Sequence, residues 1–334
     1  MYFLLLFVVV IATVSSSSLH SNDEKFLQFQ FNEFKNSFNK RYDTVEEETK
    51  RFRIFVENLK IIDERNLEER NNNGTALHGI TKFTDISTEE FKQRYLGVDI
   101  TKPMKNENAI RVELNKVPAD GAGLVDWSGV LTTPVKDQGY CGSCWAFSAT
   151  EQIESDNMRV YGSSFILSPQ QITSCDPQSG GCNGGWPYWA LEYIMSVKGQ
   201  EEEISYPYTS GTDYVTGTCN YDATKVVATI DSYYIISDKD IESNMAAYVQ
   251  STGPLSICVD ASKWSSYRGG VMTRCGKNID HAVQAVGVNT DDGYWKIRNS
   301  WGTGWGEDGY IRVAYGSNTC GLTFSSIYTT PSKI

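Results

Sequence analysis

The cysteines divide this 334-residue chain into two parts, because none of them precedes residue 141. The positions are Cys141, Cys144, Cys175, Cys182, Cys219, Cys258, Cys275 and Cys320. Such cysteine usage is typical of an oxidising compartment, where disulfides form. Counting alone allows four bridges in any of about 105 pairings. The chain is also longer than one hydrophobic core usually supports, so we expect more than one folding unit.

The extreme N-terminus agrees with export from the cytosol. Residues 2–14 are almost purely apolar and are followed by four serines. This run is too short to span a bilayer, so we interpret residues 1–18 as a secretory signal peptide. No second apolar run approaches the length of a membrane span, and we expect no stable membrane insertion.

The charge argues against nucleic acid as a partner, because nucleic-acid-binding proteins carry basic patches and this chain has a formal net charge of -11. The acidic excess lies in the second part of the chain. Residues 1–117 hold 17 basic and 18 acidic side chains, whereas residues 118–334 hold 13 and 23. Residues 101–115 separate the two parts, and we interpret them as a linker.

A helical stripe marks the first part of the chain. Six positions recur at steps of four, four, three, four and four residues, which places them on one face of one helix. They are Glu47, Arg51, Phe55, Asn58, Ile62 and Asn66. Charged and amide side chains share this stripe with Phe and Ile, so we expect a packed face whose polar groups are paired within the protein.

Cys144 stands at the start of a second helical pattern, which continues through Ala149, Ile153 and Met158. The unpaired N–H groups of a helix N-terminus favour a thiolate, the form of cysteine that attacks a carbonyl carbon. Cys141 and Cys144 also form a Cys-x-x-Cys pair, which occurs in thiol redox proteins and in zinc sites. A zinc site needs two further ligands, and we expect no metal here because this part of the chain has one histidine and no second Cys-x-x-Cys.

That histidine, His281, is the candidate base for the thiol. Residues 282–288 form an apolar strand pattern, residues 289–293 a turn signal, and residues 294–298 a return strand. A hairpin centred near Asp291 places His281 beside Asn299 and Trp301. Asn299 can then orient the imidazole through a hydrogen bond, and Trp301 can shield it from water.

These motifs together resemble the papain-like cysteine peptidases, in the order that the family has them. The motifs are Gln138–Phe147, residues 181–185, residues 280–283 and residues 299–302. The stripe matches the E-R-F-N-I-N signature of cathepsin L-like propeptides at all six positions. Gly79, Phe83 and Asp85 resemble the G-x-N-x-F-x-D motif that follows it, with Thr81 in place of the asparagine. The resemblance covers residues 47–326, nearly the whole chain.

The resemblance implies an α+β fold with two domains facing across a cleft, preceded by a helical propeptide. We expect an inhibitory propeptide at 19–117, a helical domain with the nucleophile at 118–235, and a β-barrel-like domain with the base at 236–334. Cleavage between propeptide and enzyme is expected near residues 115–119. The resemblance also implies no cofactor.

The resemblance assigns roles to individual residues. Gln138 would donate to the oxyanion together with the backbone N–H of Cys144, and the resting state would be a Cys144 thiolate with a His281 imidazolium. The implied bridges are Cys141–Cys182, Cys175–Cys219 and Cys275–Cys320, which leave Cys144 and Cys258 free. The residues implied in substrate binding are Gly184, Gly185, Trp186, Pro187, Cys258, Ile279, Asp280, Ala282, Trp301 and Ser325.

The implied activity is that of a cysteine endopeptidase that hydrolyses peptide bonds through a thioester acyl-enzyme. The precursor would be inhibited by its own propeptide and activated by acid, and the enzyme would be a monomer acting on proteins and peptides. We expect the secretory pathway, with a lysosome-like acidic compartment or the exterior as destination. Asn73 begins a glycosylation sequon. Two alternatives are a catalytically inactive papain-like binding protein and a thiol oxidoreductase.

Overall fold

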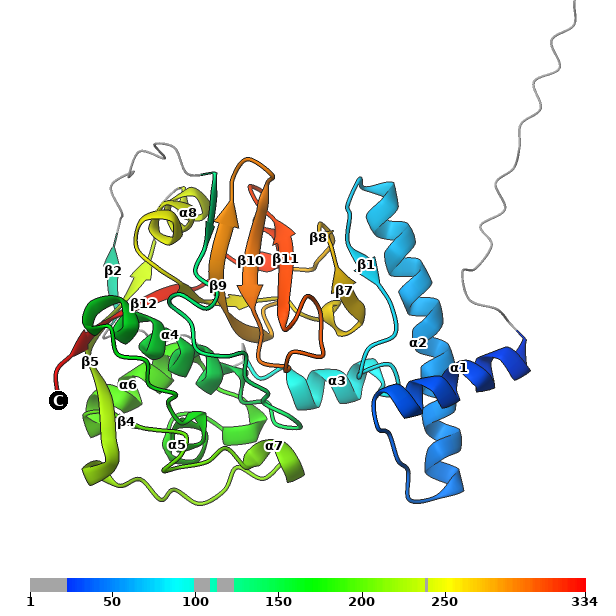
Figure 1. Ribbon diagram of the computed structural model, residues 1–334, viewed down its shortest axis with the longest axis horizontal. Coiled ribbons are helices and arrows are strands. Elements are labelled where there is room, and N and C mark those ends of the chain that lie inside the picture. The colour runs from blue at the N-terminus through cyan, green and yellow to red at the C-terminus, as the bar shows by residue number, and fades with distance from the viewer. Residues whose placement is uncertain (1–22, 99–108, 113–122, 238–239) are drawn as a thin grey trace, which may run out of the picture.

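The fold is known from a computed structural model that describes residues 23–98, 109–112, 123–237 and 240–334. The expected signal peptide at residues 1–18 and the expected cleavage region at residues 115–119 lie outside the described residues. The architecture is mixed α+β, as the resemblance implied, with helices of the N-terminal segment packed against a helical layer and a large sheet (Figure 1). No helix in the described parts of the chain is long and apolar enough to cross a membrane.

Two crossing helices open the N-terminal segment, α1 (Glu24–Ser37) and α2 (Val45–Asn71). The side chain of Asp23 caps α1 by accepting from Lys25 N, and that of Thr44 caps α2 by accepting from Glu47 N. The two helices share an aromatic and aliphatic core. Its buried members are Leu27, Phe31, Phe34, Phe55, Leu59 and Ile62.

The expected stripe lies on α2, and its polar members are paired as expected. Arg51 bonds Glu47, Glu90 and the carbonyl of Asp85. The amide of Asn58 donates to two backbone carbonyls, and Asn66 both donates to and accepts from the backbone of His78. The stripe thus fixes the returning chain between His78 and Glu90 on the long helix.

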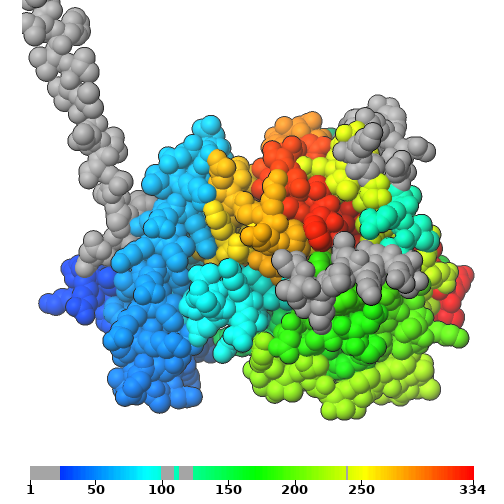
Figure 2. All heavy atoms as spheres, turned by 180° about the vertical axis from the view of Figure 1, so that it is seen from behind, coloured from blue at the N-terminus to red at the C-terminus, as the bar shows by residue number. Residues whose placement is uncertain are grey.

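The returning chain forms β1 (Leu77–His78) and α3 (Thr88–Tyr95), which begins with a capping box between Ser87 and Glu90. Phe83, Phe91 and Tyr95 do not join the core of α1 and α2, because they pack with Trp301 in the core of the large sheet. In the space-filling view, the cyan residues of α3 lie between the long blue helix and the body of the protein (Figure 2). This segment therefore belongs to the packing of the whole molecule.

The helical layer is built around α4 (Cys144–Tyr161), which ends at Gly162 with a φ of 68°. Nearly all of α4 is buried, because it packs against α6 (Pro187–Val197) on one side and against strands of the sheet on the other. Two shorter helices complete the layer, α5 (Pro169–Cys175) and α7 (Ser210–Asp213).

The large sheet has the main strand order β2-β5-β12-β6-β9-β10-β11-β8. Its strands are β2 (Ile110–Val112), β3 (Leu124–Asp126), β4 (Gln200–Glu201), β5 (Val226–Ile236), β6 (Leu255–Val259), β8 (Val271–Met272), β9 (His281–Asn289), β10 (Tyr294–Arg298), β11 (Tyr310–Ala314) and β12 (Ser326–Ser332). Helix α8 (Ile241–Ser251) packs on this sheet, and β7 (Tyr267–Gly269) pairs with β1 of the N-terminal segment. The sheet thereby carries His281, while α4 carries Cys144.

The structure corrects the interpretation of residues 101–115 as a plain linker. Ile110–Val112 form the edge strand β2, which pairs in parallel with β5 in the register Ile110↔Tyr234. Three residues are too few to show the alternation that predicts a strand. The pairing of β2 also depends on an unpaired edge of β5, which cannot be predicted from the sequence of residues 110–112.

Candidate active site

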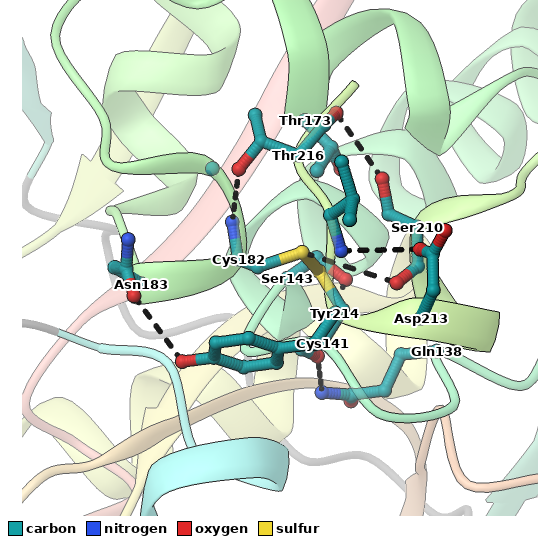
Figure 3. The surroundings of a disulfide bond; sticks show 12 residues. Gln138, Cys141, Ser143, Thr173, Cys182, Asn183, Ser210, Asp213, Tyr214 and Thr216 are labelled. Atoms are coloured by element: carbon teal, nitrogen blue, oxygen red, sulfur yellow. Dashed lines mark hydrogen bonds between the residues drawn. A yellow bond between two sulfur atoms is a disulfide. The ribbon is translucent and has the colours of Figure 1, made fainter.

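Cys144 is the first residue of α4 and is completely buried. The loop before it is fixed by the Cys141–Cys182 disulfide (Figure 3) and by the hydrogen bond from Gly142 N to Cys182 O at 3.0 Å. Because both bonds come from the segment just before α6, the start of α4 is fixed relative to the rest of the helical layer.

His281 begins β9, and the expected hairpin brings it to Asn299. Tyr294 pairs with Asn289 and Arg298 with Gln284, which is the expected register with one irregularity between Lys296 and Ile297. His281 Nε2 lies 2.8 Å from Asn299 Oδ1. Trp301 stacks on the imidazole, with 4.8 Å between ring centroids.

The hydrogen bond to Asn299 assigns the tautomer of His281. An amide oxygen only accepts, so Nε2 of His281 must carry the proton. Nδ1 is then the acceptor of the neutral ring, and it is buried with no hydrogen bond to any residue that the structure describes. This nitrogen is the one available to take a proton from a neighbouring thiol.

Gln138 lies in the loop before Cys144, with its side chain fully buried. Nε2 donates to the carbonyl of Cys141 at 2.8 Å and to that of Tyr95 at 3.1 Å, while Oε1 accepts from Ser300 Oγ at 2.6 Å. Sequence reasoning did not single out Ser300, although it stands inside the Asn299–Gly302 motif. Its N–H also donates to Asn299 Oδ1 at 2.8 Å, so one serine links the environments of Gln138 and His281.

The N-terminal segment covers Cys144. After α3, the carbonyl of Gly97 accepts from Gly185 N at 2.9 Å, and the N–H of Val98 donates to Asp280 O at 3.1 Å. Val98 pairs with Gly185 in the parallel sense. The backbone of Gly185, implied as a substrate partner, is thus occupied by the chain's own segment.

Three residues that cover the site, Tyr95, Gly97 and Val98, were missed from sequence. The sequence feature that could have indicated this segment is Gly97, a glycine just after a charged helix. The structure shows why a glycine stands there, since a Cβ on Gly97 would lie 1.9 Å from Gly142 O. The backbone N–H of Gly97 also faces the sulfur of Cys144.

This covering changes the expected protonation state of the pair. Burial raises the pKa of Cys144 well above its usual value, against the opposing effect of backbone N–H groups of Ala282, Gly97 and Trp145. Burial likewise lowers the pKa of His281, although its hydrogen bond to Asn299 acts in the other direction. Burial in the covered form therefore opposes the charged state of both groups, and the implied thiolate–imidazolium pair stays a prediction for the enzyme without its propeptide.

A cluster of apolar side chains adjoins Cys144 and contains four of the expected pocket residues. Trp186, Cys258, Ile279 and Ala282 pack in it together with Val98. Pro187 is the buried first residue of α6, and Ser325 holds Cys258 by accepting from its backbone N–H at 3.2 Å. Burial and the nearby Cys144 raise the pKa of Cys258, so its thiol is neutral.

The structure forms the three implied disulfides, Cys141–Cys182, Cys175–Cys219 and Cys275–Cys320. Cys144 and Cys258 are free and buried. A redox role for the Cys141–Cys144 pair is not favoured by this arrangement, because Cys141 is already bonded to Cys182 and cannot close a bridge with Cys144 without exchange.

Comparisons with known proteins agree with the geometry. The model of the papain family cysteine protease matches residues 123–330, and that of the cathepsin propeptide inhibitor domain matches residues 31–91. The chain is 38% identical to cysteine proteinase 1 of Dictyostelium discoideum over 345 residues, which cover 96% of this chain and 97% of the relative. It is 40% identical to cysteine proteinase B of Leishmania mexicana over 306 residues, which cover 88% of this chain and 67% of the relative.

Among solved structures, digestive procathepsin L2 of Tenebrio molitor larval midgut is similar, with a TM-score of 0.81 and 34% identity. The match covers 91% of this chain and all of the procathepsin chain. Both the catalytic domain and the N-terminal inhibitor domain are thus represented in one continuous fold. The chain belongs to the papain family of cysteine proteases and is a zymogen that carries a cathepsin-type propeptide.

Proposed function

We propose that this zymogen yields a cysteine endopeptidase that cuts peptide bonds through a thioester acyl-enzyme. The observation that supports this most is the hydrogen bond between His281 Nε2 and Asn299 Oδ1, because it leaves Nδ1 as a free acceptor in the buried site of Cys144. Gln138 and the N–H of Cys144 supply donors for an oxyanion.

In the proposed reaction, His281 takes the thiol proton once the propeptide has left and water re-enters the site. The Cys144 sulfur then forms a bond to the carbonyl carbon of the substrate, and the oxyanion is held by Gln138. His281 gives its proton to the leaving amine as the C–N bond breaks, which leaves a thioester. Water attacks the thioester, His281 accepts its proton, and the S–C bond breaks to free the acid and the thiol.

The substrate is an extended peptide bound along Gly184 and Gly185. Gly185 already pairs with an extended backbone, that of the propeptide, and its N–H is free for a substrate once the propeptide leaves. The cluster around Trp186, Cys258 and Ala282 would take the side chain of the second residue before the scissile bond. Its apolar lining favours Val, Leu or Phe there. A basic side chain should be rejected, because its burial without a partner costs about 2 kcal/mol or more.

The cut is proposed to be internal to the substrate. Only 36 residues separate Cys182 from Cys219, and they contain no histidine that could bind a free carboxyl terminus. No cysteine precedes residue 141 to tether a fragment of the propeptide in the cleft. End-blocked peptides should therefore be substrates.

Acid is proposed to release the propeptide. Glu90 is bound by Arg51 as a carboxylate, and this bond within the propeptide is lost when acid protonates Glu90. The proposed setting is the secretory pathway with an acidic compartment or the exterior as destination. The enzyme would act as a monomer, and the precursor would carry a glycan on the exposed Asn73 of the propeptide.

The test is labelling of the acid-treated protein with a thiol alkylator, with and without a peptide-like epoxide. We expect one labelled cysteine, Cys144, and protection by the epoxide. Cys144→Ala should abolish both labelling and hydrolysis of end-blocked peptides, whereas Cys258→Ala, which removes the other free cysteine, should still be labelled on Cys144. Hydrolysis by the Cys144→Ala protein would overturn the proposal. If the wild type reduced the disulfides of insulin and Cys144→Ala did not, the result would favour an oxidoreductase.

A further inference from the structure

A pair of aromatic rings joins the start of α6 to the segment before β12, beside the proposed specificity pocket. Trp186, at the start of α6, stacks on Phe324 with 6.0 Å between ring centroids and an angle of 24°. Trp186 is buried, whereas Phe324 is 46% exposed. Large exposed rings beside a substrate cleft are available to contact a ligand.

The order of residues along the pocket places this ring pair at its outer end. Cys258 and Cys144 belong to one buried cluster, and the carbonyl of Ser325 accepts from the N–H of Cys258 at 3.2 Å. Ser325 is buried, whereas the adjoining Phe324 is half-exposed, so the chain runs outward from Ser325 to Phe324. Its backbone is fixed, because its N–H donates to Gly321 O at 2.9 Å within a tight turn.

We infer that Phe324 determines specificity by closing the outer end of this pocket together with Trp186. This inference rests on the proposed function. The propeptide supports it, since the side chain that packs into the cluster is a valine, Val98. Among the apolar side chains that such a pocket takes, two stacked rings at its end favour a short branched one such as Val over the longer Phe.

The experiment compares mature wild type with Phe324→Ala and Phe324→Leu on end-blocked peptides that carry Val, Leu or Phe at the second residue before the scissile bond. We expect kcat/KM for Phe relative to Val to rise about 10-fold in Phe324→Ala and less in Phe324→Leu. Tyr161→Ala, which removes a 38% exposed ring at the far end of α4, should leave the ratio unchanged. An unchanged ratio in both Phe324 variants overturns the inference, whereas loss of all hydrolysis by wild type would contradict the proposed function itself.

A second inference concerns His78, a histidine buried at the boundary between propeptide and enzyme. It lies on β1, which pairs with β7 of the enzyme, and it is 7% exposed. Asn66 holds its backbone on both sides, at 2.8 and 2.9 Å. Its Nδ1 lies 2.9 Å from Ser266 Oγ across the boundary.

The hydrogen bonds around Ser266 suit a neutral imidazole. Arg65 Nη1 donates to Ser266 Oγ at 2.7 Å, so the hydroxyl proton of Ser266 is free to point to Nδ1 of His78. A protonated His78 would have to donate instead, and it would reverse this bond. The hydroxyl of Ser266 can take either role, so the burial of the ring and the charges beside it decide which form the site favours.

The charges that face His78 are positive. Arg65 on α2 and Lys263 on the enzyme both act on the ring, and Arg268 on β7 binds the carbonyl of Ile80 nearby. The carboxylate of Glu68 is bound by Lys263 at 2.7 Å. Burial first, and then Arg65 and Lys263, lower the pKa of His78 to about 3.

We infer that His78 is a proton sensor that lets the propeptide hold the enzyme at neutral pH and loosens it in weak acid. An imidazole in water has a pKa near 6.5, so below that pH His78 is protonated in the released propeptide and neutral in the bound one. The affinity of the propeptide for the enzyme is therefore highest above about pH 6.5 and falls about 10-fold for each pH unit below it. The carboxylates of the propeptide respond only in stronger acid.

The experiment follows autoprocessing of full-length precursors against pH. His78→Gln cannot take up a proton but keeps an acceptor for Ser266, and we expect its pH of half-processing to fall by about one unit. His78→Lys carries a permanent cation and should be processed readily even at pH 7.5. The enzymes released are identical, so their own pH profiles cannot cause the difference.

Docking is checked by hydrogen exchange in the inactive Cys144→Ala background at pH 7.5. We expect the amides of β1 and β7 to be equally protected with His78 and with Gln at that position. An unchanged pH of half-processing in His78→Gln overturns the inference. So does loss of protection in His78→Gln at neutral pH, because His78 would then be a structural contact only.

Discussion

Gly97 of the propeptide passes so close to Gly142 that a Cβ on Gly97 would lie 1.9 Å from the Gly142 carbonyl oxygen. Backbone thus meets backbone next to Cys144, where neither segment can shift without moving the loop that precedes Cys144. Overpacking of this kind costs about 1–3 kcal/mol. The latency of the zymogen should therefore depend on this glycine.

We expect Gly97→Ala to weaken the hold of the propeptide by about 10-fold or more, because the added methyl forces the two backbones apart. The readout is the activity of freshly purified precursor on an end-blocked peptide at pH 7.5, where the wild type should be silent. Gly304→Ala is the control, since a Cβ at Gly304 meets nothing within 4 Å. A precursor of Gly97→Ala that stays as silent as wild type would contradict the close approach.

Gln138→Ala in the mature enzyme should lower kcat by about 10²–10³ and change KM little, because its Nε2 acts on charge that develops only in the transition state. Steady-state kinetics with one peptide measure the two constants separately. A peptide aldehyde that mimics the tetrahedral state should lose affinity in the same proportion, while a substrate-like peptide should not. An equal rise in KM would assign Gln138 to ground-state binding.

Glu90→Gln should flatten the acid response of the propeptide. Arg51 and the N–H of Ser87 lower the pKa of Glu90 against the effect of burial, so its stabilisation is full above the unfolded value and is lost as pH falls through the folded one. We expect Cys144→Ala precursor with Glu90→Gln to melt a few degrees lower at pH 7 and nearly unchanged at pH 3. A larger effect in acid than at pH 7 would reverse this sign.

The enzyme itself should be most stable in acid because of Glu151. Burial raises the pKa of Glu151 to about 7 in spite of Arg298, whose Nε lies 3.4 Å away. A carboxyl with a raised folded pKa stabilises most below its unfolded value, and that stability is lost as pH rises toward 7. We expect Glu151→Gln to reduce the fall in melting temperature of the mature enzyme between pH 4.5 and 7.5. Identical falls in wild type and variant would contradict this.

The elements that could be predicted from the sequence are those whose residues follow a regular period over a short stretch of the chain. The spacing of Arg51, Asn58 and Asn66 fixes a helix face, and the hairpin that joins His281 to Asn299 follows from two strand patterns around one turn. The strand β2 and the path of Gly97 over Cys144 could not be predicted in this way. They depend on contacts between distant segments, and no local period records such contacts.

The division of aromatic residues among the cores affects how temperature acts on activation. Phe31, Phe34 and Phe55 leave with the propeptide as a packed group, but Phe83, Phe91 and Tyr95 are separated from Trp301 when the propeptide departs. The three aromatic rings of the propeptide and Trp301 of the enzyme are then exposed to water, and hydration of apolar surface raises the heat capacity. Propeptide release should therefore have a positive heat-capacity change, so the enthalpy of release becomes more positive as the temperature rises.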